Sequence, residues 1–161
     1  MDKLKKENYS QILFVLSVLI LTSAFIIEYI FGYQPCNLCI IERFPYILAI
    51  IILLLNYNFK NNQIFYSVLL ILVFSFSILI SVYHFSIEQG FIEESAACVS
   101  KNLDLMTKKD VLNSLQELRI SCKDVAFKIF GLSLTTYNIM ISILMFLLST
   151  KIYLLSNDIK K

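Results

Sequence analysis

Four apolar stretches, separated by polar segments, organise the chain. They cover residues 12–31, 40–56, 64–85 and 132–155. Each has, or nearly has, the roughly 20 residues that a helix needs to cross a hydrocarbon core of about 30 Å. In lipid the backbone must satisfy its own hydrogen bonds, so helices are the expected structure. The pattern therefore predicts an all-α membrane four-helix bundle, one domain over residues 1–161, with a short loop after the first span and a long loop after the third.

Composition supports a membrane protein and excludes other classes. Hydrophobic residues make up 58% of the 161 residues, and the mean hydropathy is +0.73. A soluble domain of this size cannot bury so much apolar surface. The net charge of +2, without a basic stripe, argues against nucleic-acid binding. The first stretch follows lysines as a signal peptide would, but it is long and lacks a clear cleavage site, so we expect a retained span.

The charges and the cysteines indicate the orientation of the bundle. An even number of spans places both lysine-containing termini on one side, together with Lys60, and this side is predicted to be cytoplasmic. The long loop also carries six basic residues, which weakens the charge argument. All four cysteines, however, fall in the loops of the opposite side. Disulfides persist in oxidising compartments outside the cytoplasm, so the two arguments agree.

The cysteines suggest two pairs. Cys36 and Cys39 form a C-x-x-C in the short loop, and Cys98 and Cys122 lie in the long loop. Four cysteines allow three pairings. C-x-x-C is the spacing of redox-active dithiols, and Cys98–Cys122 would then form a second bridge. Two purely structural disulfides are the alternative, and for the long-loop pair this alternative is equally plausible.

The C-x-x-C lies where a helix should begin. Pro35 precedes Cys36, and the second apolar stretch starts directly after Cys39. The exposed amides and the positive dipole end of a helix N-terminus favour a thiolate. Arg43 follows at a spacing that places it on the same helical face as both cysteines. It could stabilise a thiolate and the oxygens of an electron acceptor, although an isolated arginine at this depth is usually an interfacial anchor.

Two neighbours of Arg43 receive structural interpretations. We expect Glu42 to point away from the cysteines, into the membrane interface. Pro45 should loosen the first turn of the span because proline provides no backbone N–H. A helix over 40–56 would be about 26 Å long, slightly shorter than the hydrocarbon core. The cysteines should therefore lie at headgroup level, within reach of a lipid-soluble quinone, although a soluble acceptor also fits this depth.

Four further features are interpreted more simply. His84, the only histidine, ends the third span and is expected to satisfy local hydrogen bonds; with Cys36 and Cys39 alone it lacks the fourth ligand of a zinc site, so no metal is predicted. Asn138, with two neighbouring threonines, should join helices by hydrogen bonds. Glu28 should face the bundle or the headgroups. Residues 108–120 have the spacing of a short amphipathic helix, either on the membrane surface or within an ordinary loop.

Taken together, these motifs resemble the DsbB-type disulfide bond formation proteins. The stretch 34–43, QPCNLCIIER, is similar to that family's P-C-x-L-C-x-x-x-R signature. The segment YHFSIEQG at 83–90, followed by Cys98, resembles the entry to its second periplasmic loop. Cys122 with the following residues, and the stretch around Asn138, resemble the entry to its fourth span. The similarity covers nearly the whole chain, and its motifs occur in the family's order.

The resemblance implies a function and a place in the cell. A reduced DsbA-like protein of thioredoxin fold would be oxidised through Cys98–Cys122, and electrons would pass to Cys36–Cys39 and then to ubiquinone or menaquinone. Arg43 and His84 match family residues near the quinone. The chain of DsbA, DsbB and quinone is known to keep the periplasm oxidised. Such a protein spans the bacterial inner membrane several times, with periplasmic cysteine loops and cytoplasmic termini.

Other classes of protein share some of these features. A vitamin K epoxide reductase-like enzyme also has a quinone-facing C-x-x-C, but there the motif follows the loop pair, whereas here it comes first. A tetraspanin-like scaffold would have four spans and structural disulfides, but it gives no role to Cys36, Cys39 and Arg43 on one face. A metal-binding membrane protein would use the cysteines as ligands.

Overall fold

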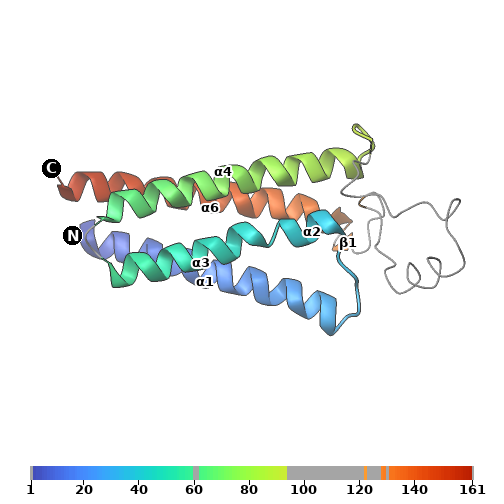
Figure 1. The fold of residues 1–161 in the computed structure, drawn as a ribbon, viewed down its shortest axis with the longest axis horizontal. Helices are drawn as coiled ribbons and strands as arrows, with labels where there is room; N and C mark the ends of the chain where they lie inside the picture. The colour runs from blue at the N-terminus through green and yellow to red at the C-terminus, as the bar shows by residue number, and fades with distance from the viewer. Residues whose placement is uncertain (1, 60–61, 94–121, 123–127, 130, 161) are drawn as a thin grey trace, which may run out of the picture.

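The computed structural model describes residues 2–59, 62–93, 122, 128–129 and 131–160. Its elements are α1 Asp2–Tyr29, α2 Asn37–Ile41, α3 Phe44–Asn58, α4 Gln63–Glu88, β1 Lys128–Ile129, β2 Leu132–Ser133 and α6 Leu134–Lys160. The long helices run lengthwise beside one another (Figure 1). Both termini lie at one end of the bundle, and α2 and β1 lie at the other. We call these the terminal end and the site end.

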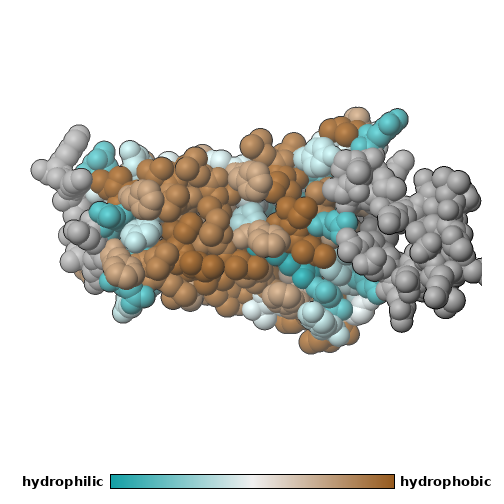
Figure 2. Space-filling model, viewed as in Figure 1, coloured by the Kyte–Doolittle hydropathy of each residue, from teal (hydrophilic) through white to brown (hydrophobic). Residues whose placement is uncertain are grey.

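Four helical segments are long and apolar enough to cross a membrane, which confirms the predicted fold class. They are Lys6–Tyr29, Asn37–Asn58, Gln63–Glu88 and Leu134–Asp158. Only 17–39% of the residues in their most apolar windows are buried, so most of the apolar side chains face outward. Figure 2 shows the result as a broad hydrophobic belt with polar residues toward both ends. This distribution suits a lipid solvent and would be costly in water.

The second predicted span consists of two helices. The amides of Glu42 and Arg43 still bond to carbonyls of α2, but Pro45 has no N–H with which to continue the ladder. Helix α3 begins afresh at Phe44, with the proline in its first turn, a position that proline favours. The predicted loosened turn is therefore an interruption of the helix at Glu42 and Arg43, within the single span Asn37–Asn58. It separates the short helix that carries the cysteines from the helix that crosses the bundle.

Helices α4 and α6 form the most extensive helix–helix contact among the described elements. Both helices carry buried small hydroxyl residues, seven residues apart on α6, and we call this set the serine seam. They are Ser67, Ser77 and Ser81 on α4 and Thr135, Ser142, Ser149 and Ser156 on α6. Small side chains let the two backbones approach closely. Ser77 and Ser142 meet at 2.9 Å, and Ser67 and Ser156 at 3.5 Å, so hydroxyls join the helices along their length.

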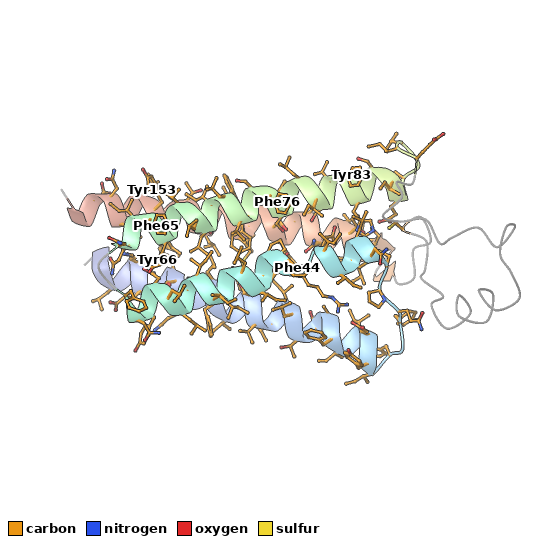
Figure 3. The ribbon with its side chains drawn as sticks, in the orientation of Figure 1. Phe44, Phe65, Tyr66, Phe76, Tyr83 and Tyr153 are labelled. Atoms are coloured by element: carbon orange, nitrogen blue, oxygen red, sulfur yellow. A yellow bond between two sulfur atoms is a disulfide. The ribbon has the colours of Figure 1, made fainter. Side chains whose placement is uncertain are left out.

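Larger side chains fill the rest of the core. Leu13 of α1, Tyr46 and Ile52 of α3, Phe74 of α4 and Met145 of α6 belong to one buried cluster. Near the terminal end, the buried Lys6 side chain donates a hydrogen bond to the amide oxygen of Gln63. Aromatic residues lie toward both ends of the bundle, with Tyr66 and Tyr153 near one end and Tyr83 near the other (Figure 3). Tyrosines at these two levels are typical of a membrane interface.

A small hairpin precedes the last helix. β1 pairs with β2 in antiparallel fashion, and Gly131 has a positive φ of 82° in the intervening turn. Helix α6 therefore begins at Leu134, two residues after the predicted start of the fourth span. The Ser133 hydroxyl accepts a hydrogen bond from the amide of Thr136, as an N-cap residue does. The predicted amphipathic helix at 108–120, and Cys98, lie outside the described residues.

Candidate functional site at the end of the bundle

The Cys36–Cys39 disulfide begins helix α2. Cys36 is the N-cap, with an extended backbone (φ −69°, ψ 167°), and its sulfur accepts a hydrogen bond from the Cys39 amide at 3.2 Å. The two sulfurs are bonded, and the Cα atoms lie 5.1 Å apart. Cys36 is buried, whereas Cys39 is half-buried. The first four amides of a helix have no partner within it, and here the Cys39 amide bonds to sulfur instead. The sequence predicts this arrangement, which favours a thiolate.

His84 and Glu42 form a chain of contacts that ends on Cys36. Nε2 of His84 lies 3.6 Å from the Cys36 sulfur, and Nδ1 lies 3.1 Å from the Glu42 carboxylate. His84 and Glu42 are only 3% and 8% exposed. In the tautomer with its hydrogen on Nδ1, His84 donates to the Glu42 carboxylate and presents the lone pair of Nε2 to the sulfur.

The position of Glu42 corrects the prediction that it points away into the interface. Glu42 is three residues after Cys39, a spacing that places both on one side of α2. The chain then breaks, and the carboxylate turns into the bundle, where His84 of α4 provides a donor. The sequence did not indicate this partner, without which a buried carboxylate would be costly.

Arg43 lies at the break between α2 and α3 and is paired. Its guanidinium contacts the Glu28 carboxylate of α1 at 2.5 Å and lies over the Phe25 ring, 5.2 Å from the centroid. Arg43 lines the same cavity as Cys36 and Cys39, as the helical spacing predicts. Glu28 faces the bundle, one of its two predicted positions. The ion pair and the ring stabilise a charge that would otherwise be costly at this depth.

These residues surround a cavity of about 210 Å³ between α1, α2, α3, α4 and α6. Ile20, Leu21, Ala24 and Ile27 give it an apolar wall on α1. The opposite side is polar, with Arg43, Glu42 and His84 beside the disulfide; Tyr46 and Asn138 also line it. In Figure 1, α1 diverges from α3 toward the site end, on the side where this apolar wall lies.

Asn138 joins three helices beneath the disulfide. Its side-chain oxygen accepts from the Tyr46 hydroxyl at 2.5 Å, and its NH₂ group donates to Ser81 at 2.8 Å. The predicted interhelical role of Asn138 is confirmed. Of the two neighbouring threonines, Thr136 differs from the prediction, because it bonds locally to Ser133. The network ties the cavity to the serine seam, since Tyr46 also meets Ser142 at 3.3 Å.

Cys122 of the long loop lies against the C-x-x-C. It is 3% exposed and shares a buried cluster with Cys36, Leu38 and Ile87, with Tyr83 packed beside them. It also lines the cavity. No described cysteine is a free thiol. The predicted pairing of Cys122 with Cys98 involves a residue outside the described part.

Three contacts were not predicted from the sequence. They are the Glu28–Arg43 pair, the Glu42–His84 pair and the packing of Cys122 on Cys36. A signal existed for the pairs, because every acid and base near the membrane boundary needs a partner. Two acids, Glu28 and Glu42, and three bases, Arg43, His84 and Lys151, were available within the predicted spans. Nothing in the sequence indicates which acid joins which base.

Comparison with known proteins gives one family. The family model described as "Disulfide bond formation protein DsbB" matches residues 6–152. A protein of Rickettsia prowazekii (strain Madrid E), named Uncharacterized protein RP370, is 34% identical over 148 residues, which is 87% of this chain and 85% of that protein. No solved structure was found to match. The matched residues contain the C-x-x-C, Arg43, His84, the first three spans and most of the fourth, so the chain belongs to the DsbB family and is a multi-pass membrane protein of disulfide bond formation.

Proposed function

We propose that this protein reoxidises a DsbA-like thiol oxidase outside the cytoplasm and passes the electrons to a membrane quinone, ubiquinone or menaquinone. The observation that carries the proposal is the placement of one disulfide. Cys36–Cys39 lines a cavity that apolar side chains of α1 and the cation of Arg43 also line. A redox-active pair, an apolar wall and a fixed positive charge are the elements that a thiol–quinone exchange requires.

The cavity suits the head of a quinone. Cavities of about 150 Å³ with apolar walls accommodate benzene, so about 210 Å³ has room for a substituted six-membered ring. Its apolar wall would contact the ring, Arg43 would donate to one ring oxygen, and Nε2 of His84 would donate to another once it has taken up a proton. A bound quinone would accept the two electrons and two protons that a dithiol releases when it closes to a disulfide.

The chain's own residues prepare the dithiol for that closure. The Cys39 amide already contacts the Cys36 sulfur, which favours its thiolate. Nε2 of His84 is positioned to take the Cys36 proton, and Glu42 would stabilise the resulting imidazolium through Nδ1. The reduced pair loses two protons and two electrons in forming the sulfur–sulfur bond. Arg43 holds a positive charge at the cavity throughout.

Packing supports a route between the two cysteine pairs. Cys122 shares a buried cluster with Cys36, so a thiolate at Cys122 would have a disulfide sulfur nearby. Attack would form a Cys122–Cys36 bond and release the Cys39 thiolate. Such an exchange conserves electrons. We propose that Cys98–Cys122 oxidises the partner and is then regenerated by Cys36–Cys39.

The proposed exchange with a partner outside the cytoplasm requires one orientation of the bundle in the membrane. We propose that the site end faces the periplasm of a bacterial inner membrane and that both termini are cytoplasmic. The two termini lie together at the end of the bundle opposite α2 (Figure 1). Lysines near both termini fit the positive-inside rule.

The test is a quinone-reduction assay with two electron donors. Purified protein should reduce a soluble quinone analogue with a DsbA-type dithiol protein or with dithiothreitol. Cys36→Ser or Cys39→Ser should lower both activities at least about 1,000-fold, because the chemical step loses a sulfur. A Cys98→Ser, Cys122→Ser double variant should retain the dithiothreitol activity and lose the activity with the partner. Wild-type turnover in the Cys36→Ser protein would refute the mechanism.

A further inference from the structure

Cys36, Cys39 and His84 form a compact set of metal-ligating groups. Their ligand atoms all lie within 4.8 Å of one another. We propose that the reduced form of this site binds a thiophilic divalent cation, Zn²⁺ being the best suited, through the two thiolates and Nε2 of His84. The cation and the disulfide would then compete for the same two sulfurs. The proposal concerns a site for metal, and it holds whether or not a quinone is the electron acceptor.

The distance between the histidine and the buried cysteine fits zinc. In a tetrahedral site with Zn–S of about 2.3 Å and Zn–N of about 2.0–2.1 Å, sulfur and nitrogen ligands stand about 3.6 Å apart. Nε2 of His84 and the Cys36 sulfur are 3.6 Å apart. The two cysteines have the C-x₂-C spacing of paired zinc ligands. Reduction would free their sulfurs to separate by the distance that a shared ion requires.

Glu42 prepares the histidine for this role. Metal-binding histidines usually donate their second N–H to a carboxylate or carbonyl, which fixes the tautomer and orients the ring. The Glu42 carboxylate lies 3.1 Å from Nδ1 of His84, and Nε2 faces the sulfur. Both side chains are buried, so the ring is held in this orientation before any metal binds.

The local charges permit a divalent ion. Two thiolates would balance its charge of +2. The nearest fixed cation that lines the cavity, Arg43, is already paired with Glu28. Three protein ligands leave a fourth coordination position for water. The cavity provides space for that ligand.

The consequence is a site gated by redox state. The oxidised protein should not bind the ion, because both sulfurs are joined in a disulfide. In the reduced protein, the bound ion would hold the thiolates and slow their oxidation. Zinc should therefore inhibit closure of the Cys36–Cys39 disulfide by occupying its sulfurs.

Metal titration of the full chain in detergent tests the proposal. The Cys98→Ser, Cys122→Ser protein is reduced, freed of reductant without oxygen, and titrated with Co²⁺ and then Zn²⁺. We expect one equivalent of Co²⁺, with a thiolate charge-transfer band and the visible bands of a tetrahedral ion, displaced by one equivalent of Zn²⁺. His84→Ala and Glu42→Gln should weaken Zn²⁺ binding about 10- to 100-fold, and Cys36→Ser by more. Glu88→Gln, which alters another acid lining the cavity, should leave the affinity unchanged.

The comparison of redox states needs no substitution in the ligand set, so it remains decisive even if a variant fails to fold. Equal Zn²⁺ binding by oxidised and reduced protein would overturn the proposal, as would wild-type affinity in a folded His84→Ala protein. Reoxidation of the reduced protein by diamide should slow at least 10-fold with bound Zn²⁺; an unchanged rate would also overturn it. Neither quinone nor partner protein is present, so a failure here leaves the quinone assay unaffected.

Discussion

The serine seam and the cavity share helices but differ in their polar groups: the seam uses small hydroxyl residues, and the cavity uses charged pairs. In the seam, α4 and α6 approach through small hydroxyl residues that bond to one another or to their own helix, as Ser149 bonds to the Met145 carbonyl. At the cavity, α1 and the broken α2–α3 segment contribute charged side chains in pairs. The two regions meet at His84, which lies on the same buried face of α4 as Ser77 and Ser81. The close packing of α4 thus positions His84, which the cavity uses.

Among substitutions that compare the seam with the cavity, the largest effect is expected where a charge at the cavity is removed. Arg43→Met should lower kcat/KM for the quinone about 10- to 100-fold, because charge-assisted hydrogen bonds contribute about 1.5–3 kcal/mol and Glu28 loses its partner. Steady-state kinetics with dithiothreitol and varied quinone measure the change. Arg43→Lys should recover part of the loss, since it restores the charge without the planar fork.

Glu28 provides the matched control for that result. If Arg43 acts only as a structural anchor, Glu28→Gln, Arg43→Met should remove the unpaired charge and restore wild-type kinetics. If Arg43 acts on the acceptor, the double variant should regain thermal stability while kcat/KM stays low. Full recovery of kcat/KM in the double variant would contradict the proposed role.

A smaller effect is expected where the seam is overpacked. Ser149 is fully buried, seven residues from both Ser142 and Ser156 on α6, and Ser149→Leu should destabilise the bundle by about 1–3 kcal/mol. Titration with sodium dodecyl sulfate, followed by circular dichroism, measures the loss. Leu147→Phe adds bulk on the exposed side of the same helix and should change stability by less than about 0.5 kcal/mol. The activity per folded molecule of both variants should equal that of wild type; a selective loss in Ser149→Leu would mean that the regions are more strongly coupled.

The features that depend on local spacing could be predicted from the sequence. Apolar stretches of membrane length determine four helices, because lipid allows few other backbone conformations. The C-x-x-C at a helix start and the position of Arg43 also follow from local spacing. Both depend on neighbours in the chain, so the pattern of residues contains the necessary information.

The remaining contacts depend on helix rotation, which the sequence alone does not determine. Glu42 and His84 are 42 residues apart, and Tyr46 and Asn138 are 92 apart. Which of these groups meet is decided by how the α2–α3 segment packs on α4 and α6, and the small residues that bring α4 and α6 together were interpreted only as parts of apolar spans. The break before Pro45 also turned Glu42 inward, opposite to the prediction. Polar groups within spans are therefore better treated as pairs to be matched than as separate anchors.

The smallest effect should come from the residue that belongs to both regions. Tyr46 lines the cavity, and its hydroxyl bonds to Asn138 at 2.5 Å and meets Ser142 of the seam at 3.3 Å. Tyr46→Phe keeps the ring and removes the hydroxyl, so stability should fall by about 0.5–1.5 kcal/mol, the usual net value of one hydrogen bond. Detergent unfolding measures this loss, and Tyr66→Phe, at the terminal end of α4 (Figure 3), serves as the matched control.

The kinetics of Tyr46→Phe separate the two regions. If the hydroxyl serves the seam, the quinone KM should stay within about twofold of wild type, since a loss below about 0.4 kcal/mol in binding corresponds to that factor. The Ser142→Ala, Tyr46→Phe double variant should then lose less stability than the sum of the single variants, because both remove the same contact. A large rise in KM with unchanged stability would instead assign Tyr46 to the cavity. The cavity would then include Tyr46, and the seam would begin at Ser142.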